Sequence, residues 1–321
     1  MKRMYVIGIV CIIAIGVWSG KSARAYDLPS VNLGFTSFVD GGPPAGPGLY
    51  FMQYIQYWTS DEFNNRKGDR KLPPFADEDL NAWISLSQLV YQSDREILFG
   101  GKWGLDFIIP CVSIDLDYGI PNTFGFPMDN GSGIGDILIG PFLQWDPIMG
   151  QNGPILMHRI ELQMILPTGK YNENRELNAG SNFFSFNPYW SGTLFLGPKW
   201  TVSMRLHYLW NDKNDDPNRN FGGADDTQAG QAIHANFAVA REVVPKRLRL
   251  GLNGYYLKQL GDTEVDGNDV SGSRERVLGL GPGGVYHFSR DNHLFFDLYF
   301  ESKVEERPKG ERFNLRFVHH F

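Results

Sequence analysis

The sequence predicts an all-β fold, a transmembrane antiparallel β-barrel of about 12 strands with long outer loops and short periplasmic turns. Three observations lead to this fold class: an N-terminal leader, a series of extended runs whose apolar residues alternate with period two, and connections that alternate between long and short. Bacterial outer-membrane barrels have an even strand number, short periplasmic turns and longer outer loops. A soluble sandwich would also alternate along its strands, but it has no reason to sort its loops by parity.

The chain of 321 residues begins with the features of a secretory signal peptide. Two bases precede an apolar run over residues 6–18, and Ala23-Arg24-Ala25 is a small-x-small cleavage site. The rival interpretation, a transmembrane anchor, is weak because the run is shorter than the roughly 20 residues that a spanning helix needs. We therefore expect residues 1–25 to be removed and Tyr26 to begin the mature chain.

The mature chain is expected to be acidic. Residues 1–25 contain four bases and no acid, so their removal leaves 26 bases against 36 acids. Nucleic acid is attracted by basic surfaces, so no nucleic-acid partner is expected. Cys111 would be the one remaining cysteine, which excludes an intramolecular disulfide. The expected surroundings are membrane lipid and lipopolysaccharide, in the outer membrane of a bacterial cell.

Residues 26–48 form a segment that ends in Gly41-Gly42-Pro43-Pro44-Ala45-Gly46-Pro47-Gly48. This density of glycine and proline excludes a helix or an interior strand. The segment nevertheless carries more apolar side chains than a free tail should expose to water, among them Val31, Leu33, Phe35 and Phe38. We expect these residues to form a plug that enters the barrel and obstructs it; the alternatives are docking on a periplasmic partner and disorder.

The barrel itself is expected over residues 49–321. Extended runs occupy 49–59, 80–91, 102–114, 134–145, 155–167, 186–196, 199–210, 229–242, 247–260, 276–288, 293–303 and 312–321. The first, third and later odd-numbered connections are mostly long and polar, whereas the even-numbered ones are mostly tight. This parity predicts that both termini lie on the periplasmic side.

The clearest single strand is Lys199–Trp210. One face carries Trp200, Val202, Met204, Leu206, Tyr208 and Trp210, and the other carries Thr201, Ser203, Arg205 and His207. From Trp200 to Trp210 a strand tilted by about 40° spans roughly 25 Å along the barrel axis, which matches an apolar band between aromatic girdles.

Charged and polar residues opposite the apolar face of their strands are the candidates for the lumen and the solute path. They are Asp106, Arg159, Glu161, Arg205, His207 and Arg316. A charge left in lipid near the midplane costs about 2–4 kcal/mol. We therefore expect these side chains to face inward and to pair with one another.

The last ten residues, 312–321, alternate between an apolar and a polar face and end the chain on Phe321. A closing strand with a C-terminal aromatic residue has the form that outer-membrane barrels present to their assembly machinery, so Phe321 is the expected contact with that machinery. A soluble edge strand would look similar, and this stretch alone does not decide between them.

No sequence pattern indicates catalysis, a cofactor or a metal site. The sequence contains no G-x-S-x-G elbow, phosphate loop, H-E-x-x-H or paired C-x-x-C motif. Ser203 and His207 share a strand face, but side chains along such a face are spaced by roughly 7 Å, too far for the hydrogen bond that a hydrolase needs. We expect no catalytic residues, no cofactor and no metal, and a protein that is not an enzyme.

Several stretches resemble a known bacterial family. They are Asn32–Gly41, the following glycine- and proline-rich block through Phe51, and Gly133–Pro141 with Gln144-Trp145. The family is labelled "protein of the meta-pathway of phenol degradation", or SphA-like, and the resemblance covers essentially the whole mature chain. The resemblance implies an outer-membrane barrel that works in a way similar to the fatty-acid and aromatic-hydrocarbon transporters of that membrane. It also implies a link to aromatic catabolism, without a catalytic step.

The expected function is therefore the passage of small, hydrophobic or aromatic solutes. A 12-stranded barrel is wider than an eight-stranded one, which side chains fill, and narrower than the 16- to 18-stranded porins with open water channels. This favours a constricted or plugged path. Two alternatives stay open: a structural or adhesive barrel without transport, and an outer-membrane hydrolase.

Overall fold

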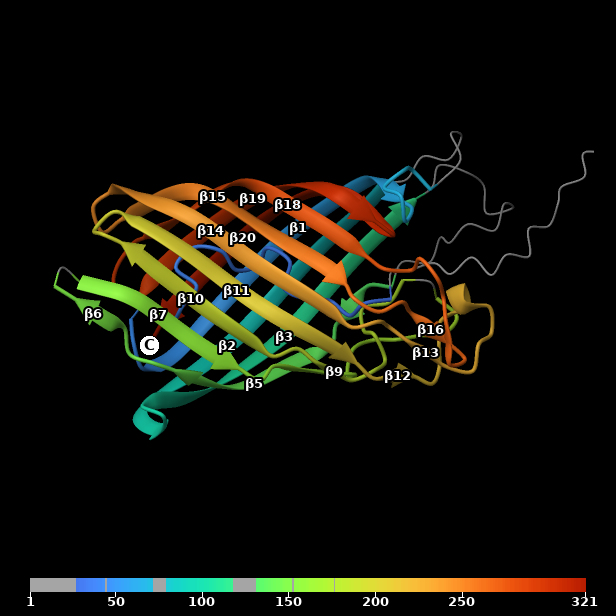
Figure 1. The fold of residues 1–321 in the computed structure, drawn as a ribbon, viewed down its shortest axis with the longest axis horizontal. Helices are drawn as coiled ribbons and strands as arrows, with labels where there is room; N and C mark the ends of the chain where they lie inside the picture. Colours follow the sequence, from blue (N-terminus) through green and yellow to red (C-terminus); the bar gives the residue numbers. More distant parts are fainter. Residues whose placement is uncertain (1–26, 44, 72–78, 118–130, 152, 176) are drawn as a thin grey trace, which may run out of the picture.

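The computed structural model describes residues 27–43, 45–71, 79–117, 131–151, 153–175 and 177–321. The leader expected over residues 1–25, and Tyr26 after it, lie outside these residues. One antiparallel sheet closes on itself as a long barrel, and the connections gather at its two ends (Figure 1). No helix in the described part of the chain is both long and apolar enough to span a membrane.

The strands of the barrel wall follow one another in chain order around the barrel. They are β1 (Gly48–Asn64), β2 (Asp79–Leu98), β3 (Gly101–Asp117), β4 (Gly133–Ile134) with β5 (Ile137–Gln144), β7 (Gly153–Glu161) with β8 (Met164–Leu166), β9 (Ser185–Phe186) with β10 (Tyr189–Leu196), β11 (Trp200–Asn211), β14 (Ala232–Val244), β15 (Leu248–Gln259), β18 (Arg276–His287), β19 (Asn292–Glu305) and β20 (Arg307–His320). β4 and β5, β7 and β8, and β9 and β10 are each one strand interrupted by two residues, so the described wall has twelve strands and the predicted fold is confirmed.

β20 pairs with β1, and this pairing closes the barrel. Tyr50 stands opposite His320 at one end of the pair and Asn64 opposite Arg307 at the other. The end that carries the short turns and Phe321 is called the turn end below, and the opposite end, with the long connections, is called the loop end (Figure 1). Of the smaller elements, β6 (Ile148–Gly150) extends the wall at the turn end by pairing with β7.

A second, small sheet and a short helix lie at the loop end. They are β12 (Lys213–Asn214), β13 (Thr227–Gln228), β16 (Glu264–Val265), β17 (Asn268–Asp269) and the 3-10 helix η2 (Arg219–Phe221). Their residues come from two of the long connections that the sequence indicated.

One connection differs from the expected parity. The sequence predicts the final strand from Arg312 and a short outer loop before it, whereas β20 already begins at Arg307 and only Glu306 separates it from β19. Residues 307–310 lack an apolar alternation, yet their backbone pairs with the outer end of β1, opposite Ser60–Asn64. Glu306 makes the turn with a positive φ of 50°.

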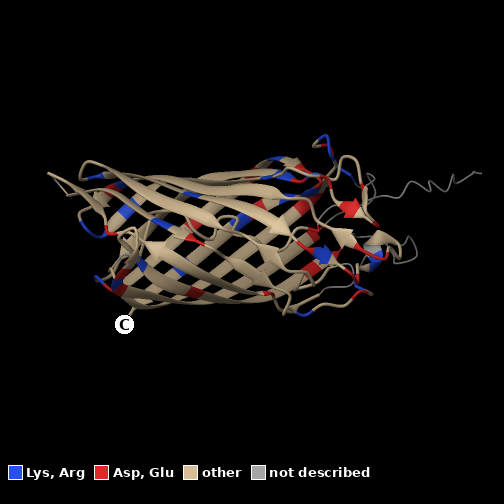
Figure 2. Ribbon diagram, turned by 60° about the horizontal axis from the view of Figure 1, so that its bottom comes forward, with Lys and Arg blue, Asp and Glu red and all other residues tan. Residues whose placement is uncertain are grey.

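The outer face of the wall is apolar and carries aromatic pairs near both ends. Tyr57 lies 4.7 Å from Trp83 between ring centroids, and Tyr91 lies 5.4 Å from Trp103. Trp83 and Tyr91 are eight residues apart on β2, roughly 20 Å along the axis of a tilted strand. Charged residues crowd both ends of the barrel and are sparse across its middle (Figure 2), which is the pattern of a membrane-spanning wall.

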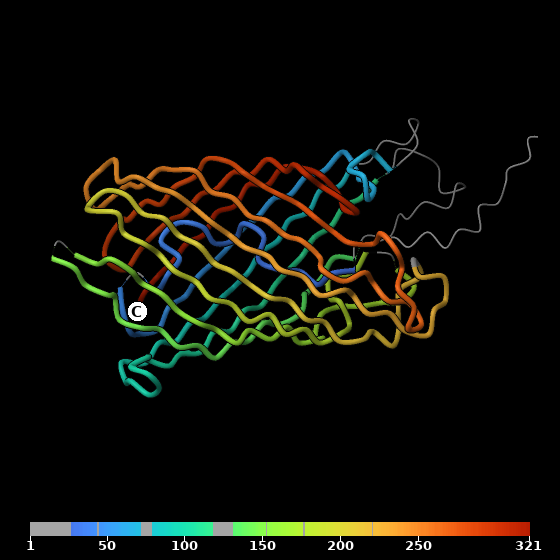
Figure 3. Tube along the Cα trace, viewed as in Figure 1, coloured from blue at the N-terminus to red at the C-terminus, as the bar shows by residue number. Residues whose placement is uncertain are grey.

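The N-terminal segment runs through the inside of the barrel from one end to the other (Figure 3). Asp27 accepts a hydrogen bond of 2.8 Å from Thr263 at the loop end. The carbonyl oxygen of Pro47 lies 3.1 Å from Nε2 of His320 at the turn end, where β1 begins. The segment therefore starts at the loop end and traverses the lumen before β1 begins. The prediction that both termini lie on the periplasmic side is wrong, because Asp27 and Phe321 lie at opposite ends of the barrel: the segment crosses the lumen once before the first strand.

The orientation in the membrane can be tested by cysteine labelling in a Cys111→Ser background. Single cysteines at Lys67, Asn174, Asp215 or Asn268, all in loop-end connections, should react with an impermeant thiol reagent on whole cells, because the long loops face outward. A cysteine at Lys246, in the β14–β15 turn, should not. Equal labelling of all five positions would contradict this orientation.

Candidate functional site

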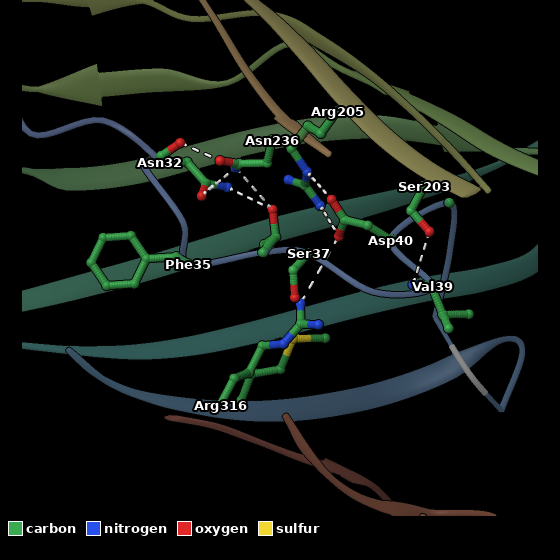
Figure 4. Close-up of polar contacts among 12 residues, drawn as sticks. Asn32, Phe35, Ser37, Val39, Asp40, Ser203, Arg205, Asn236 and Arg316 are labelled. Carbon is green, nitrogen blue, oxygen red and sulfur yellow. Dashed lines mark hydrogen bonds and ion pairs between the residues drawn. The ribbon is translucent and has the colours of Figure 1, made fainter. Parts of the chain in front are cut away.

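The N-terminal segment is held in the lumen by hydrogen bonds from its own backbone to side chains of the wall. The amide of Gly34 donates to Oδ1 of Asn236 at 3.0 Å, that of Val39 to Oγ of Ser203 at 3.0 Å and that of Gly41 to Oγ1 of Thr193 at 2.8 Å. An irregular segment has no sheet ladder to satisfy these buried groups, so inward polar side chains must do so. Figure 4 shows Asn236 and Ser203 pointing at the segment.

Two glycines of the segment allow it to approach the wall closely. Gly34 has a φ of 81°, which disfavours any other residue, and a Cβ there would lie 2.6 Å from the ring of Tyr299. A Cβ on Gly41 would lie 2.3 Å from the carbonyl oxygen of Met157. Gly34 is therefore required by both conformation and packing, and Gly41 by packing.

The apolar residues expected to form the plug lie inside the barrel. Leu33, Phe35 and Phe38 are buried, and Val31 is half-buried. Leu33 packs in a cluster with Tyr255 and Tyr299, and the Phe38 cluster includes Tyr50, Met52 and Tyr54 of β1. The inner face of β1 is thus apolar because it covers the segment. Whether the segment obstructs a solute stays a prediction.

An ion pair joins the segment to the middle of the lumen. Nε and Nη2 of Arg205 donate to the two carboxylate oxygens of Asp40 at 2.7 and 2.8 Å (Figure 4). Nη1 of Arg316 approaches the same carboxylate at 3.9 Å. Asp40 and both arginines are buried, so the pair is shielded from solvent. A fork-to-fork pair of this kind fixes the position of the segment along the barrel axis.

The six lumen residues chosen from the sequence all face inward and are buried. The expected pairing among themselves is met by Arg159 and Glu161, whereas others of the six have partners outside this set. Arg159 and Glu161 approach each other at 3.6 Å, but Asp106 accepts both of its bonds from Gln88 at 2.7 and 2.8 Å. Arg205 and Arg316 instead face Asp40.

His207 stacks on a second histidine instead of joining the charged residues. The ring centroids of His207 and His234 are 4.0 Å apart, and the planes are within 13° of parallel. The hydroxyl of Ser203 lies 3.0 Å from that of Thr193 and accepts from the segment backbone. Ser203 therefore has a structural partner on each side, and a nucleophile activated by His207 finds no support in this geometry.

The sequence did not single out three residues that complete this network. They are Asp40, which binds Arg205; Gln88, which binds Asp106; and Tyr189, whose hydroxyl donates to Glu161 at 2.5 Å. Gln88 and Tyr189 follow the same period-two rule as the six and could have been found by it. Asp40 lies in an irregular segment, where no periodicity indicates which way a side chain points.

A cavity of about 530 Å³ lies between the segment and one side of the wall. Its apolar side comes from β2 and β3 and includes Leu80, Ala82, Ile84, Leu86, Ile108 and Val112. Gln88, Asp106, Arg159, Arg205 and Arg316 also line it, closer to the turn end. The lumen is therefore divided lengthwise. The segment is hydrogen-bonded to β10, β11, β14 and β19, and the space opposite is lined by apolar side chains. The polar and charged residues at the turn-end side of this cavity, Gln88, Asp106, Arg159, Arg205 and Arg316, are called the cavity floor below.

Two acidic groups meet where the segment enters at the loop end, outside the membrane-spanning strands. Burial raises the pKa of Asp27 to about 6, against the hydrogen bond from Thr263. Burial also raises the pKa of Glu275 to about 8; the guanidinium of Arg307 opposes this rise and Asp27 adds to it. Arg307 donates to Glu275 at 3.1 Å. Protonation of the two carboxyls therefore stabilises the folded state at this contact.

This contact predicts a pH-dependent stability. Folding raises the pKa of Asp27 from 3.8 to about 6 and that of Glu275 from 4.5 to about 8. The contribution of the two protonated carboxyls to the stability of the folded state is therefore fully present below about pH 4. It is lost as the pH rises through about 6 for Asp27 and about 8 for Glu275. Asp27→Asn should raise the melting temperature at pH 8 and leave it unchanged at pH 4. Asp215→Asn, at an exposed loop carboxyl, is the control and should change neither. An equal effect of Asp27→Asn at both pH values would contradict the prediction.

A family model with the description "Putative MetA-pathway of phenol degradation" matches residues 60–317. The chain belongs to this family. The match spans the barrel wall from the outer part of β1 almost to the end of β20, so the family named from the sequence is confirmed. The matched residues do not include the stretch 32–51 from which the resemblance was partly drawn. Among curated proteins, none matches this member of the phenol-degradation family in sequence.

One solved structure shares the fold of this family member, and a second is less similar. An outer membrane channel from Pseudomonas putida F1 is similar with a TM-score of 0.74 and 20% identity, over 91% of this chain and all of that one. The β domain of the Bordetella autotransporter BrkA reaches a TM-score of 0.49 and 11% identity, over 86% of this chain and all of the other. The first likeness shows the fold of an outer-membrane β-barrel, and the protein is thus placed in the bacterial outer membrane.

Proposed function

We propose that this protein is a channel for small hydrophobic or aromatic solutes, which pass between the N-terminal segment and the apolar side of the wall. The observation that carries the proposal is the cavity of about 530 Å³, lined lengthwise by apolar side chains of β2 and β3. An aqueous pore has polar walls, whereas small-molecule sites are mostly apolar with a few polar groups. The similar Pseudomonas putida protein is described as a channel, which supports the same reading.

Uptake by cells tests this proposal. Ile84 faces the cavity on β2, and Ile55 faces outward on the neighbouring β1. Ile84→Trp should fill the path and lower the uptake of dilute toluene or phenol several-fold in cells that depend on this barrel. Ile55→Trp adds the same ring to the lipid face and should leave uptake unchanged. If both variants, folded and equally abundant, matched the wild type, the cavity would not be the path.

The two alternatives make different predictions. A structural or adhesive barrel would show the same solute uptake with and without the protein. A hydrolase would lose an activity on Ser203→Ala, but the contacts of Ser203 described above give it a role in holding the segment instead. The channel is favoured over both because neither of them uses a lengthwise apolar cavity.

A further inference from the structure

Arg316 carries a buried guanidinium whose hydrogen-bonding capacity is only partly used among the described residues. It lies on β20, is 5% exposed and lines the cavity. Its Cζ sits 3.7 Å above the centroid of the Phe295 ring, which leaves the edge of the guanidinium open. Nε has no hydrogen-bond partner among the described residues, and the carboxylate of Asp40 lies 3.9 Å from Nη1, beyond hydrogen-bond distance. Buried polar groups normally have partners, so a missing acceptor is indicated.

The carboxylates around Arg316 have donors of their own: Asp297, for example, accepts hydrogen bonds from Ser37 and Asn253, each at 2.9 Å. Asp40 is held by both arms of Arg205, and Asp106 receives bonds from Gln88 on both oxygens. Tyr189 donates to Glu161. None of these acids is therefore free to turn fully toward Arg316. A planar carboxylate from outside would match the fork of the guanidinium, which is the geometry that arginine binds best.

The walls beside Arg316 suit an aromatic ring. Met52, Leu86, Ile108 and Val318 line the same cavity, and so does Phe295, whose ring stacks on the guanidinium. A ligand bound here would place its charged head at the floor and its ring against these apolar side chains. A cation would meet the arginine, and a pure hydrocarbon would leave the guanidinium without an acceptor.

We propose that the cavity floor binds a small aryl carboxylate, with the carboxylate on Arg316 and the ring on the apolar wall. This assignment rests on the proposed function and names the solute class that its path selects. A site built to hydrogen-bond a polar group discriminates strongly against an analogue that lacks the group. The floor therefore selects an aromatic acid over the hydrocarbon of the same shape.

Calorimetric titration of the purified, folded barrel with benzoate and with toluene tests the assignment. Toluene carries a methyl group in place of the carboxylate and so isolates its contribution. We expect saturable benzoate binding and at least about tenfold weaker binding of toluene. Arg316→Gln should weaken benzoate binding by about tenfold, the effect of losing one charge-assisted interaction. Arg95→Gln, which removes the same charge from an exposed position near the turn end of β2, should have no effect.

Two results would overturn the assignment: toluene binding as tightly as benzoate, or benzoate binding that is unchanged by Arg316→Gln. If Arg316→Gln fails to fold, two other measurements decide. One is the comparison of benzoate with toluene binding to the wild type. The other is Leu86→Trp, which should displace the aromatic ring and weaken benzoate binding. The toluene uptake assay separates this inference from the channel proposal. Normal uptake with no benzoate binding would reject the site and leave the channel intact, whereas benzoate binding without any uptake would reject the channel alone.

Discussion

Replacing Met204 with arginine is expected to block assembly of the barrel in a membrane, whereas replacing the adjacent Arg205 with methionine is not. Met204 lies on the outer face of β11 and is 45% exposed, while Arg205 points into the lumen and is 8% exposed. An arginine facing lipid near the midplane costs about 2–4 kcal/mol, a large part of the stability of a typical folded domain. Heat-modifiable migration of membrane fractions on gels measures the folded proportion.

The lumen variant needs a matched control, because Arg205→Met leaves Asp40 without its bidentate partner. An unpaired buried charge is itself destabilising. Combining Arg205→Met with Asp40→Asn removes both charges, so the double variant should assemble at least as well as the single one. If Arg205→Met were the more damaging of the two single changes at positions 204 and 205, the register of β11 would be off by one residue.

The period-two alternation was sufficient to locate the wall because lipid and lumen impose opposite demands on neighbouring residues. It identified all twelve strands, most with ends within a few residues of those observed. It failed at strand ends beyond the regular alternation: residues 307–311 at the loop end of β20 and residues 92–98 at the turn end of β2 are polar or irregular in pattern. Backbone pairing continues at these strand ends, but the side chains there do not alternate between lipid and lumen, so the sequence pattern does not indicate the strand.

The candidate site was harder to derive than the wall. Facing inward is a local property of a strand, so the six lumen residues could be chosen from the sequence. Their partners are set by how the N-terminal segment lies across the lumen, and the Asp40–Arg205 contact joins residues 165 positions apart. Nothing in the sequence around either residue indicates that the other is its partner. The unpartnered Nε of Arg316 likewise becomes visible only when its neighbours in space are known.

Deleting Val31–Pro44 is expected to raise the ion conductance of the barrel several-fold in planar bilayers. Leu33, Phe35 and Phe38 are buried in the lumen, and the segment is fixed by the Asp40–Arg205 pair and by backbone hydrogen bonds to the wall. A barrel of this strand number is wide enough to hold more than its own side chains. Removing the segment should therefore open an aqueous path that the apolar cavity does not provide to ions.

A point variant tests the same idea without shortening the chain. Asp40→Ala breaks the ion pair inside the lumen, and the uncompensated Arg205 should loosen the segment and give frequent conductance steps above the wild-type level. The matched control is Asp146→Ala, which removes an ion-paired aspartate from the exposed turn end, where Lys102 lies 2.6 Å away. A solvated pair of this kind contributes little, so its conductance should equal that of the wild type. If the deletion variant folds and conducts no better than the intact barrel, the segment does not obstruct ions, and the path through the lumen must be closed by the wall itself.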